Sequence, residues 1–346
     1  MTADVLTKIF GLTSISFIVA IILTPILTNF LYKYKLGKPI RNDGTTPVYS
    51  ELHIKKQGTP TMGGILIWGT VTILAFGFWF LDRILHISWF HQFNFLTRRE
   101  TLLPLGAFLG ASIVGLMDDF LDIRQLGHKG RGFPFRFKVL IYAIVAGIGS
   151  WWFYAKLGYN FVHIPFWGDL TIGWLFIPFF ILVVVGTSFA VNQTDGLDGL
   201  AGGTLLISFF SYAIFAFMQG RGNLAIFLGV ICGALLAFLW FNVYPARFFM
   251  GDTGSMGLGV LLAIVAFLTN RVLLLPIIGI IFVVTAISSM LQIAWKKLAK
   301  QKLFLSSPIH HHLEAKGWPE TKVTMRFWIL SAVGSIAAVV IYFLEK

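Results

Sequence analysis

Ten stretches of mostly apolar residues, each about as long as a membrane-spanning helix, decide what this chain can fold into. A helix needs about 20 such residues to cross a bilayer. Hydrophobic residues fill 57% of the 346 positions and charged residues 12%, whereas about a quarter of the residues in soluble domains are charged. We therefore predict an all-α polytopic membrane protein with about ten transmembrane helices. The stretches lie at residues 7–32, 60–81, 101–117, 139–155, 174–191, 200–218, 223–241, 257–270, 272–295 and 326–344.

The connections between these stretches are short enough to predict a single integral membrane domain over residues 1–346. The longest of them, 33–59, 118–138 and 296–326, contain no repeat and no low-complexity tract. The first stretch is longer than the apolar part of a secretory signal and lacks a small-residue cleavage site, so we expect it to remain as a helix. With one cysteine, Cys232, neither a disulfide framework nor a thiolate metal site is expected.

Basic residues predict the orientation of the chain, because cytoplasmic loops carry the excess of Lys and Arg. Alternate connections hold 19 of the 27 basic residues, so we place these connections on the cytoplasmic face and both termini on the extracytoplasmic side. Loops that border anionic lipid attract it by about 1 kcal/mol per basic residue. The net charge of +12 therefore predicts membrane lipid, and no nucleic acid, as a partner. The basic connections are 33–59, 118–138, 192–199, 242–256 and 296–326.

Acidic residues gather in four clusters within these connections, each beside the end of an apolar stretch. An ionised group near hydrocarbon costs on the order of several kcal/mol, so the clusters indicate a functional site, and their composition suggests a metal ion and phosphates. All four fall on one predicted face, which favours a single cytoplasmic active site. The clusters are Asp118, Asp119 and Asp122; Asp195 and Asp198; Asp252; and Glu314, which follows His310-His311-His312.

Helical geometry predicts how the first two clusters direct their side chains. Asp118 and Asp119 are adjacent, so their side chains point about 100° apart, and one can face a metal while the other faces a different group. Carboxylates at the C-terminal end of a helix oppose its dipole, which favours a functional role. Asn192, Asp195 and Asp198 recur every three residues and, if helical, cover an arc of about 120° that can converge on one ligand.

Magnesium fits these oxygen ligands better than zinc. Mg²⁺ prefers one or two carboxylates together with substrate phosphates and water, and Asp252 lies in a glycine-flanked segment before an apolar stretch.

Consecutive histidines on a helix cannot all face one ion. We therefore expect His310, His311 and His312, after Pro308, to form a loop that donates hydrogen bonds to phosphate or sugar.

Small residues predict close helix packing at three places. Lys56 and Thr61 precede Gly63-Gly64 and lack the Gly-Lys-Ser/Thr ending of a phosphate-binding loop, so this segment indicates a helix entry with a small-residue packing face. The glycine pairs in 106–110 and 229–233 can pack helices within one chain or between two chains.

The whole chain resembles the bacterial phospho-N-acetylmuramoyl-pentapeptide transferases, members of the polyprenyl-phosphate N-acetylhexosamine-1-phosphate transferase superfamily. The acidic motifs are shared across the superfamily, whereas the Pro-Ile-His-His-His and Arg-Phe-Trp elements favour the muramoyl branch. The motifs that carry the resemblance are Gly58-Thr-Pro-Thr-Met-Gly-Gly64, Asp118-Asp119, Asn192-Gln-Thr-Asp-Gly-Leu-Asp-Gly199, Phe249-Met-Gly-Asp252, Ser307-Pro-Ile-His-His-His312, Lys316-Gly-Trp-Pro319 and Met325-Arg-Phe-Trp328.

The resemblance implies transfer of phospho-N-acetylmuramoyl-pentapeptide from its UDP carrier to undecaprenyl phosphate at the bacterial inner (plasma) membrane, which gives lipid I and UMP in peptidoglycan synthesis. It also implies Mg²⁺ as a cofactor and a homodimer. By the same resemblance, Asp118 deprotonates or orients the lipid phosphate, Asp119, Asp195 and Asp252 hold Mg²⁺, and Phe249 stacks on uracil. The other implied site residues are Lys56, Thr61, Lys138, Asn192, Asp198 and Asn242 for substrate binding, and His310, His311 and His312 for catalysis.

Several alternatives remain open from the sequence. A sister transferase that uses UDP-N-acetylglucosamine for another surface polymer shares the acids and the topology. A transporter also carries acids within the membrane, although near the bilayer midplane and with repeat symmetry. Direct attack by the lipid phosphate and a covalent intermediate on a carboxylate are both compatible with the motifs. Asp122 stands where the family usually has lysine, and Lys129 or Arg131 can compensate for that cation.

Overall fold

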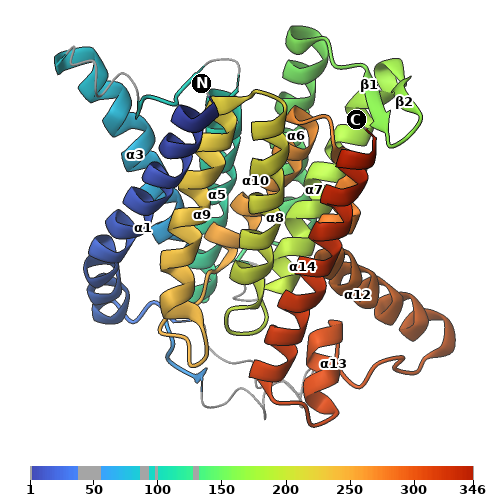
Figure 1. Cartoon of the computed structure of the whole chain (residues 1–346). Coiled ribbons are helices and arrows are strands. Elements are labelled where there is room, and N and C mark those ends of the chain that lie inside the picture. The colour runs from blue at the N-terminus through green and yellow to red at the C-terminus, as the bar shows by residue number, and fades with distance from the viewer. Residues whose placement is uncertain (1, 38–55, 86–92, 98–99, 128–131, 346) are drawn as a thin grey trace.

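In the computed structural model, long helices run side by side in a bundle, and α1 begins at the same end of the bundle as α14 finishes (Figure 1). The structure describes residues 2–37, 56–85, 93–97, 100–127 and 132–345. Nine helices of this part of the chain are long and apolar enough to cross a membrane, which confirms a multi-pass membrane protein. These nine are built on α1 (Thr2–Lys33), α3 (Gly64–Leu85), α5 (Leu102–Ile123), α6 (Phe135–Trp151), α7 (Phe176–Thr194), α8 (Leu200–Met218), α9 (Gly222–Asn242), α12 (Ile280–Ala299) and α14 (Glu320–Leu344).

A shorter apolar helix, α10 (Asp252–Leu268), lies in the centre of the bundle. It contacts α3, α5, α7 and α8, and all of its residues after Asp252 are buried. A helix that is apolar on every side is stable when neighbours surround it. Its 17 residues rise about 26 Å at 1.5 Å each, so α10 accounts for the predicted stretch 257–270. The sequence placed its start five residues too late, because glycines and Asp252 weaken the apolar signal.

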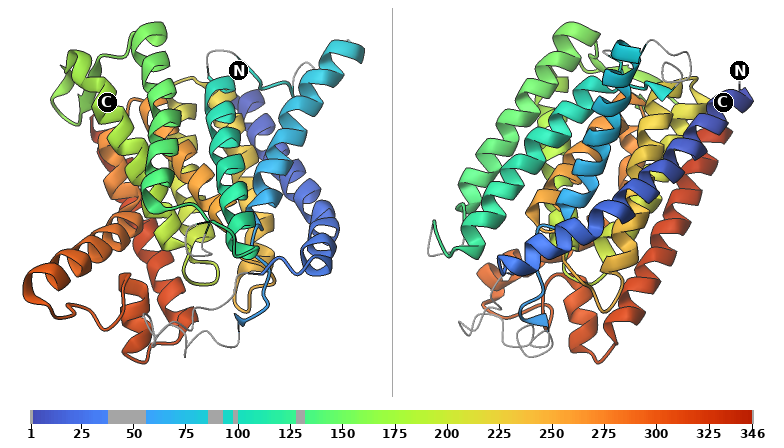
Figure 2. Two further views of the ribbon diagram at one scale, coloured as in Figure 1. Left: turned by 180° about the vertical axis from the view of Figure 1, so that it is seen from behind. Right: turned by 90° about the vertical axis from the view of Figure 1, so that its left-hand side faces the viewer.

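The predicted helix 272–295 is wrong as one element. The chain instead forms a short 3₁₀ helix, η5 (Val272–Leu274), a four-residue helix, α11 (Leu275–Ile278), and then α12, with the break at Gly279. A Cβ added at Gly279 would lie 3.0 Å from the Phe282 ring and 3.1 Å from the Leu275 carbonyl oxygen, so glycine permits the close turn. After the break, α12 leans away from the bundle (Figures 1 and 2).

A small β-hairpin, which the sequence did not predict, is added to an otherwise helical fold. After α6 and a π-helical turn, η3 (Trp152–Lys156), strands β1 (Phe161–Ile164) and β2 (Gly168–Thr171) pair antiparallel, and the 3₁₀ turn η4 (Gly173–Leu175) leads into α7. Side chains alternate between the two faces of such a hairpin, and the turn uses a left-handed φ of 89° at Gly168. Four-residue strands are too short to stand out from the surrounding apolar sequence.

Among the described residues, the two glycine pairs differ in whether they pack against another helix of the same chain. A Cβ added at Gly229 would lie 2.7 Å from Thr13 Oγ1, and one added at Gly233 would lie 2.8 Å from Ser16 Cβ. The glycine pair of α9 therefore packs against α1 of the same chain. By contrast, a Cβ added at Gly106 or Gly110 of α5 would meet no atom of the described residues within 4 Å.

Candidate active site

The predicted acidic clusters come together at the end of the bundle opposite the start of α1. Here α5 and α7 finish and α10 begins (Figure 1). The helix α5 continues to Ile123, six residues beyond the predicted end, so Asp118 and Asp119 lie in its last turns and are both buried. Their side chains contact different groups, as expected for adjacent residues of a helix, whose side chains point about 100° apart.

Asp118 belongs to a group that we call the Lys138 cluster, defined as Asp118, Lys138, Asn192 and Asp252. The Lys138 ammonium pairs with Asp118 Oδ2 and lies 3.0 Å from Asp252 Oδ2. Asn192 Nδ2 donates a hydrogen bond to Asp252 Oδ1 at 3.0 Å, and the backbone N–H of Phe133 donates to Asp118 Oδ1 at 2.7 Å. Four helices or their ends thus bring two carboxylates to one cation.

Asp119 contacts the start of α10. Its side chain is fully buried, Oδ1 accepts the Asp252 N–H at 3.1 Å, and Oδ2 accepts the Thr253 N–H at 3.0 Å. The Gly251 N–H donates to Asp195 Oδ2 at 3.0 Å. Carboxylates at a helix N-terminus satisfy free N–H groups and complement the helix dipole. Both acids therefore hold the backbone that carries Asp252, and their role as Mg²⁺ ligands stays a prediction.

A second group, the Lys56 cluster, consists of Lys56, Asp198 and Glu320. The Lys56 ammonium lies 2.6 Å from Asp198 Oδ1 and 2.5 Å from Glu320 Oε1. Asp198 Oδ2 accepts the Ala246 N–H at 3.0 Å, and Glu320 Oε1 accepts the Asp198 N–H at 2.7 Å. Burial opposes the charge on Lys56, but Glu320 and Asp198 outweigh it and raise the pKa of the ammonium above its ordinary value.

The structure corrects the predicted arc of Asn192, Asp195 and Asp198. The helix α7 ends at Thr194, and Asp195 is its C-cap residue with a non-helical ψ of 53°. The chain then turns before α8. As a result Asp198 contacts Lys56, whereas Asn192 contacts Asp252. Side chains three residues apart point to one face only within a continuous helix.

The segment between α9 and α10 connects the two clusters. Asn242 Oδ1 accepts the Gly199 N–H at 3.0 Å, and its Nδ2 donates to the Phe248 carbonyl oxygen at 2.8 Å. The ring of Phe249 lies beneath the Lys56 ammonium, 5.8 Å from its centre. Asn242 therefore orders the loops around the site, and Phe249 offers a partly exposed aromatic face beside a cation.

The segment before α3 packs against the same place, as its glycines predicted. Thr61 is buried, and its Oγ1 would lie 2.7 Å from a Cβ added at Gly251. The N–H of Gly64 donates to the Met250 carbonyl oxygen at 2.9 Å. Thr61 therefore contacts the backbone next to Asp252, and the helix-entry prediction is confirmed.

The three histidines lie in a short helix, α13 (Ile309–Ala315), and the predicted loop is wrong. A Cβ added at Gly196 would lie 3.0 Å from His311 Nε2, so the His310–His311 side packs on the turn between Asp195 and Asp198. His311 Nδ1 lies 2.7 Å from Glu314 Oε2.

His312 faces another part of the chain. Its Nδ1 accepts the Leu305 N–H at 3.1 Å, and burial together with Lys316 lowers its pKa. Of the three predicted histidines, the structure thus brings His310 and His311 to the acidic turn and leaves His312 beside the loop that precedes α13.

Sequence reasoning missed Glu320, the first residue of α14. Acidic residues are common in the first turn of any helix, so nothing in the local pattern distinguishes it. Asp122, the departure from the family pattern, lies one turn beyond Asp118 in α5. Lys129 and Arg131, predicted to compensate for it, lie outside the described residues.

Comparisons with known proteins agree with this architecture. A family model described as glycosyl transferase family 4 matches residues 101–270, which include α5, α7, α9 and α10. The match covers just under half of the chain, so it shows a similarity of this multi-pass membrane protein to that class of transferase. A second model, phospho-N-acetylmuramoyl-pentapeptide-transferase signature 1, matches residues 56–67.

Relatives identify the family. The phospho-N-acetylmuramoyl-pentapeptide-transferase of Chloroflexus aggregans is 39% identical over 342 residues, 95% of this chain and 87% of the relative. The enzyme of the same name from Clostridium perfringens is 41% identical over 322 residues, 92% of this chain and 94% of the relative. This chain belongs to the phospho-N-acetylmuramoyl-pentapeptide transferase family.

Proposed function

We propose that this protein transfers phospho-N-acetylmuramoyl-pentapeptide from UDP-N-acetylmuramoyl-pentapeptide to undecaprenyl phosphate, which releases UMP and gives lipid I for peptidoglycan synthesis. The observation that carries the proposal is that the four predicted acidic clusters, which are far apart in the sequence, lie together at one end of a membrane bundle. The relatives of the chain bear the name of this activity. The same names favour a muramoyl donor over UDP-N-acetylglucosamine.

The proposal places this end of the bundle at the cytoplasmic face and both termini on the other side. The excess of Lys and Arg in the connections at this end supports that orientation. A nucleotide-sugar then arrives from water and a polyprenyl phosphate arrives from the inner leaflet. The membrane bundle gives both substrates access to one site.

Mg²⁺ fits the Lys138 cluster. One ammonium already contacts Asp118 and Asp252 together, so these two carboxylates converge on a single cation position. Two carboxylates with substrate phosphates and water suit Mg²⁺. Among the described residues no group of three or more metal-binding side chains is preassembled. When bound, Mg²⁺ would neutralise charge on the diphosphate.

We assign the protein's own groups as follows. Asp252 holds the cation as predicted, and Asp118 takes the place of the predicted ligands Asp119 and Asp195, whose oxygens accept backbone N–H groups. Asp118 also orients the lipid phosphate or accepts its proton. Asn192 fixes the Asp252 carboxylate through its 3.0 Å hydrogen bond. Lys138 supplies a positive charge to the phosphates, since phosphoryl transfer depends on positioning and charge neutralisation.

The nucleotide is assigned to the neighbouring surface. Phe249 offers an aromatic ring for uracil, with Lys56 5.8 Å above its centre. His310 and His311 pack on the turn at Gly196 and can donate hydrogen bonds to phosphate or sugar there. In direct attack, Asp118 would orient the lipid phosphate or accept a remaining proton from it, because a phosphate monoester is largely deprotonated at neutral pH. In a covalent route, a carboxylate would be the nucleophile.

The test is release of UMP from purified protein. We expect release with UDP-N-acetylmuramoyl-pentapeptide, dependent on both polyprenyl phosphate and Mg²⁺, and removal of the metal with a chelator should abolish it. Equal turnover of UDP-N-acetylglucosamine would favour the sister transferase. UMP release without polyprenyl phosphate would favour a covalent intermediate over direct attack.

We also propose a homodimer, as the family resemblance implies. The surface of α5 at Gly106 and Gly110, where an added Cβ would meet no described atom within 4 Å, is a candidate for close helix contact between chains. Cysteine cross-linking at these two positions in membranes tests it.

A further inference from the structure

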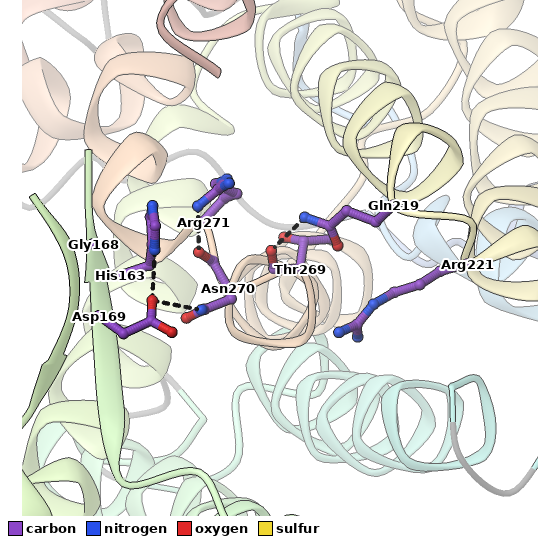
Figure 3. A pocket seen from close by; sticks show the side chains of 8 residues that line it. All are labelled: His163, Gly168, Asp169, Gln219, Arg221, Thr269, Asn270 and Arg271. Atoms are coloured by element: carbon purple, nitrogen blue, oxygen red, sulfur yellow. Dashed lines mark hydrogen bonds and ion pairs between the residues drawn. The ribbon is translucent and has the colours of Figure 1, made fainter. Parts of the chain in front are cut away.

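At the other end of the bundle, the β-hairpin borders an open cavity of about 480 Å³ that is lined by polar residues (Figure 3). This volume lies within the range of small-molecule sites. The cavity lies far from the acidic motifs in the fold, beside the finishing ends of α8 and α10 and the start of α9. Its lining residues are His163, Gly168, Asp169, Gln219, Arg221, Thr269, Asn270 and Arg271.

Two arginines reach this cavity from different segments. Arg221, just before α9, donates to the Leu268 carbonyl oxygen, and no carboxylate of the described chain pairs with it. Arg271, just after α10, has a carboxylate oxygen of Glu345 at 3.4 Å, and Glu345 also contacts His163. Two full positive charges therefore border the cavity, and one of them has no internal counter-ion among the described residues.

The acidic side chain of the cavity has its own partners. Asp169 lies across the cavity from Arg221 in the view of Figure 3. Its Oδ1 atom contacts His163 Nδ1 at 2.5 Å and accepts from Asn270 Nδ2 at 3.4 Å. Asp169 thus interacts with His163 and Asn270 and with neither arginine, and Arg221 is the arginine that has no carboxylate partner among the described residues and can attract an anion. Guanidinium groups bind phosphate through paired N–H donors.

The opposite face of the same hairpin is apolar. Val162, Ile164 and Leu170 line a groove of about 340 Å³ together with Phe179 and Leu273. Arg271 and Leu273, two residues apart, line the polar cavity and the apolar groove respectively. An apolar groove and a cavity that contains two arginines therefore lie on the two sides of one hairpin.

Exposed aromatic residues of this hairpin are typical of a segment at the surface of the bilayer. Phe166 and Trp167 at the turn are 63% and 88% exposed, and Trp174 is 68% exposed. Aromatic side chains of this kind gather where the hydrocarbon of a membrane meets its headgroups. At that depth lipid phosphates are the most abundant anions.

From the two arginines, the apolar groove and the exposed aromatic turn, we infer that this cavity binds the phosphodiester headgroup of a membrane phospholipid. Arg221 and Arg271 contact the phosphate, and an acyl chain lies in the neighbouring groove. In the orientation proposed above, the lipid belongs to the outer leaflet. The inference concerns a lipid that is neither donor nor acceptor in the transfer reaction.

Native mass spectrometry of the delipidated full-length protein tests the chemistry of the ligand. Three probes separate its parts: dioleoyl-phosphatidylglycerol, dioleoylglycerol without phosphate, and glycerol 3-phosphate without chains. We expect phosphatidylglycerol to remain bound at concentrations at least tenfold below those needed for the other two. Equal binding of dioleoylglycerol would overturn the role of the arginines. Equal binding of glycerol 3-phosphate would instead assign the cavity to free phosphate esters.

Variants locate the bound lipid. Removing both charges, R221Q with R271Q, should weaken phosphatidylglycerol binding at least tenfold. The single variant R221Q, which leaves the Arg271–Glu345 contact in place, should weaken it about threefold or more, and thermal unfolding checks that it folds. R83Q is the matched control, because Arg83 in the last turn of α3 lies outside the cavity. Wild-type affinity in both R221Q and the double variant would refute the site.

Transferase activity gives an independent readout. UMP release by R221Q in excess detergent and substrate should match the wild-type rate, because the cavity and the acidic motifs lie at opposite ends of the bundle. Loss of lipid binding with full activity would therefore support this site without depending on the proposed reaction. Loss of activity without loss of lipid binding would contradict it.

Discussion

The Lys138 and Lys56 clusters each place one ammonium between two carboxylates, yet the donors that surround these carboxylates differ. In the Lys56 cluster, Asp198 accepts the backbone N–H of Ala246, and Glu320 accepts that of Asp198. In the Lys138 cluster, Asp118 also accepts a backbone N–H, that of Phe133, but Asp252 accepts from the side chains of Asn192 and Lys138.

This difference separates a fixed contact from one that can exchange. Backbone donors cannot leave without moving the chain, so the Lys56 cluster holds the loops together beside the Phe249 ring. Side-chain donors rotate between rotamers, so in the proposed reaction Lys138 would be able to move from the carboxylates to a substrate phosphate on binding of Mg²⁺. We therefore expect the Lys138 cluster to act in the transfer reaction and the Lys56 cluster to stabilise the loops of the site.

The largest effect is expected from Asp252→Asn in the exchangeable cluster. Loss of one charge that stabilises a transition state lowers kcat by about 10²–10³, and we expect at least a 100-fold fall in UMP release. The amide keeps the size of the side chain, so insertion and thermal stability should stay near wild type. Asp4→Asn, a change in an exposed acid of the first turn of α1, is the control. Near-wild-type turnover of Asp252→Asn would remove this cluster from the mechanism.

The next test exchanges the two lysines for methionine. Lys138→Met should lower kcat about 10–100-fold with a small change in KM for the nucleotide, because the charge acts on the phosphates during transfer. Lys56→Met should mainly raise that KM and lower the free energy of unfolding by roughly 1–3 kcal/mol, because Asp198 and Glu320 lose their shared cation. Steady-state kinetics and thermal unfolding of both variants measure the difference. The same kcat loss in both would show that the clusters do not differ in role.

The sequence could predict the helices and the gathering of the acids, because both follow from local composition. Apolar length locates the membrane helices, and charge near hydrocarbon is so unfavourable that Asp118, Asp195 and Asp252 have to serve a site. Their common position at one end of the bundle follows from the alternation of the connections. Close packing at Gly64 is equally local, since small residues permit it.

The partners of individual side chains could not be predicted, because they depend on contacts between distant segments. Asp119 meets the first N–H groups of α10, a helix that begins 133 residues later along the chain. Asp198 leaves the helical face because α7 ends at Thr194. Glu320 has an ordinary place at a helix start and reaches Lys56 only through the tertiary fold.

The histidines offer a smaller test of which side chains reach the acidic turn. His310→Asn should lower UMP release about tenfold, because that ring packs on Gly196 between Asp195 and Asp198. His312→Asn should stay within about twofold, because His312 accepts a hydrogen bond from Leu305 instead. UMP release at saturating substrate compares the pair, and equal losses would contradict the placement of the two rings.

The smallest expected effect is the pH dependence of the Lys56 cluster. The pKa of Lys56 is raised in the folded protein by Glu320 and Asp198 against the opposing effect of burial. A raised folded-state pKa gives stability that is fully present below the unfolded value of about 10.4 and is lost as the pH rises through the folded value. The unfolding temperature of the wild type should therefore fall towards that of Lys56→Met above about pH 10, while between pH 7 and 9 the gap between the two proteins stays constant. A gap that already closes below pH 9 would mean that Lys56 is not held by these carboxylates, and the contrast between a fixed and an exchangeable cluster would then lose its physical basis.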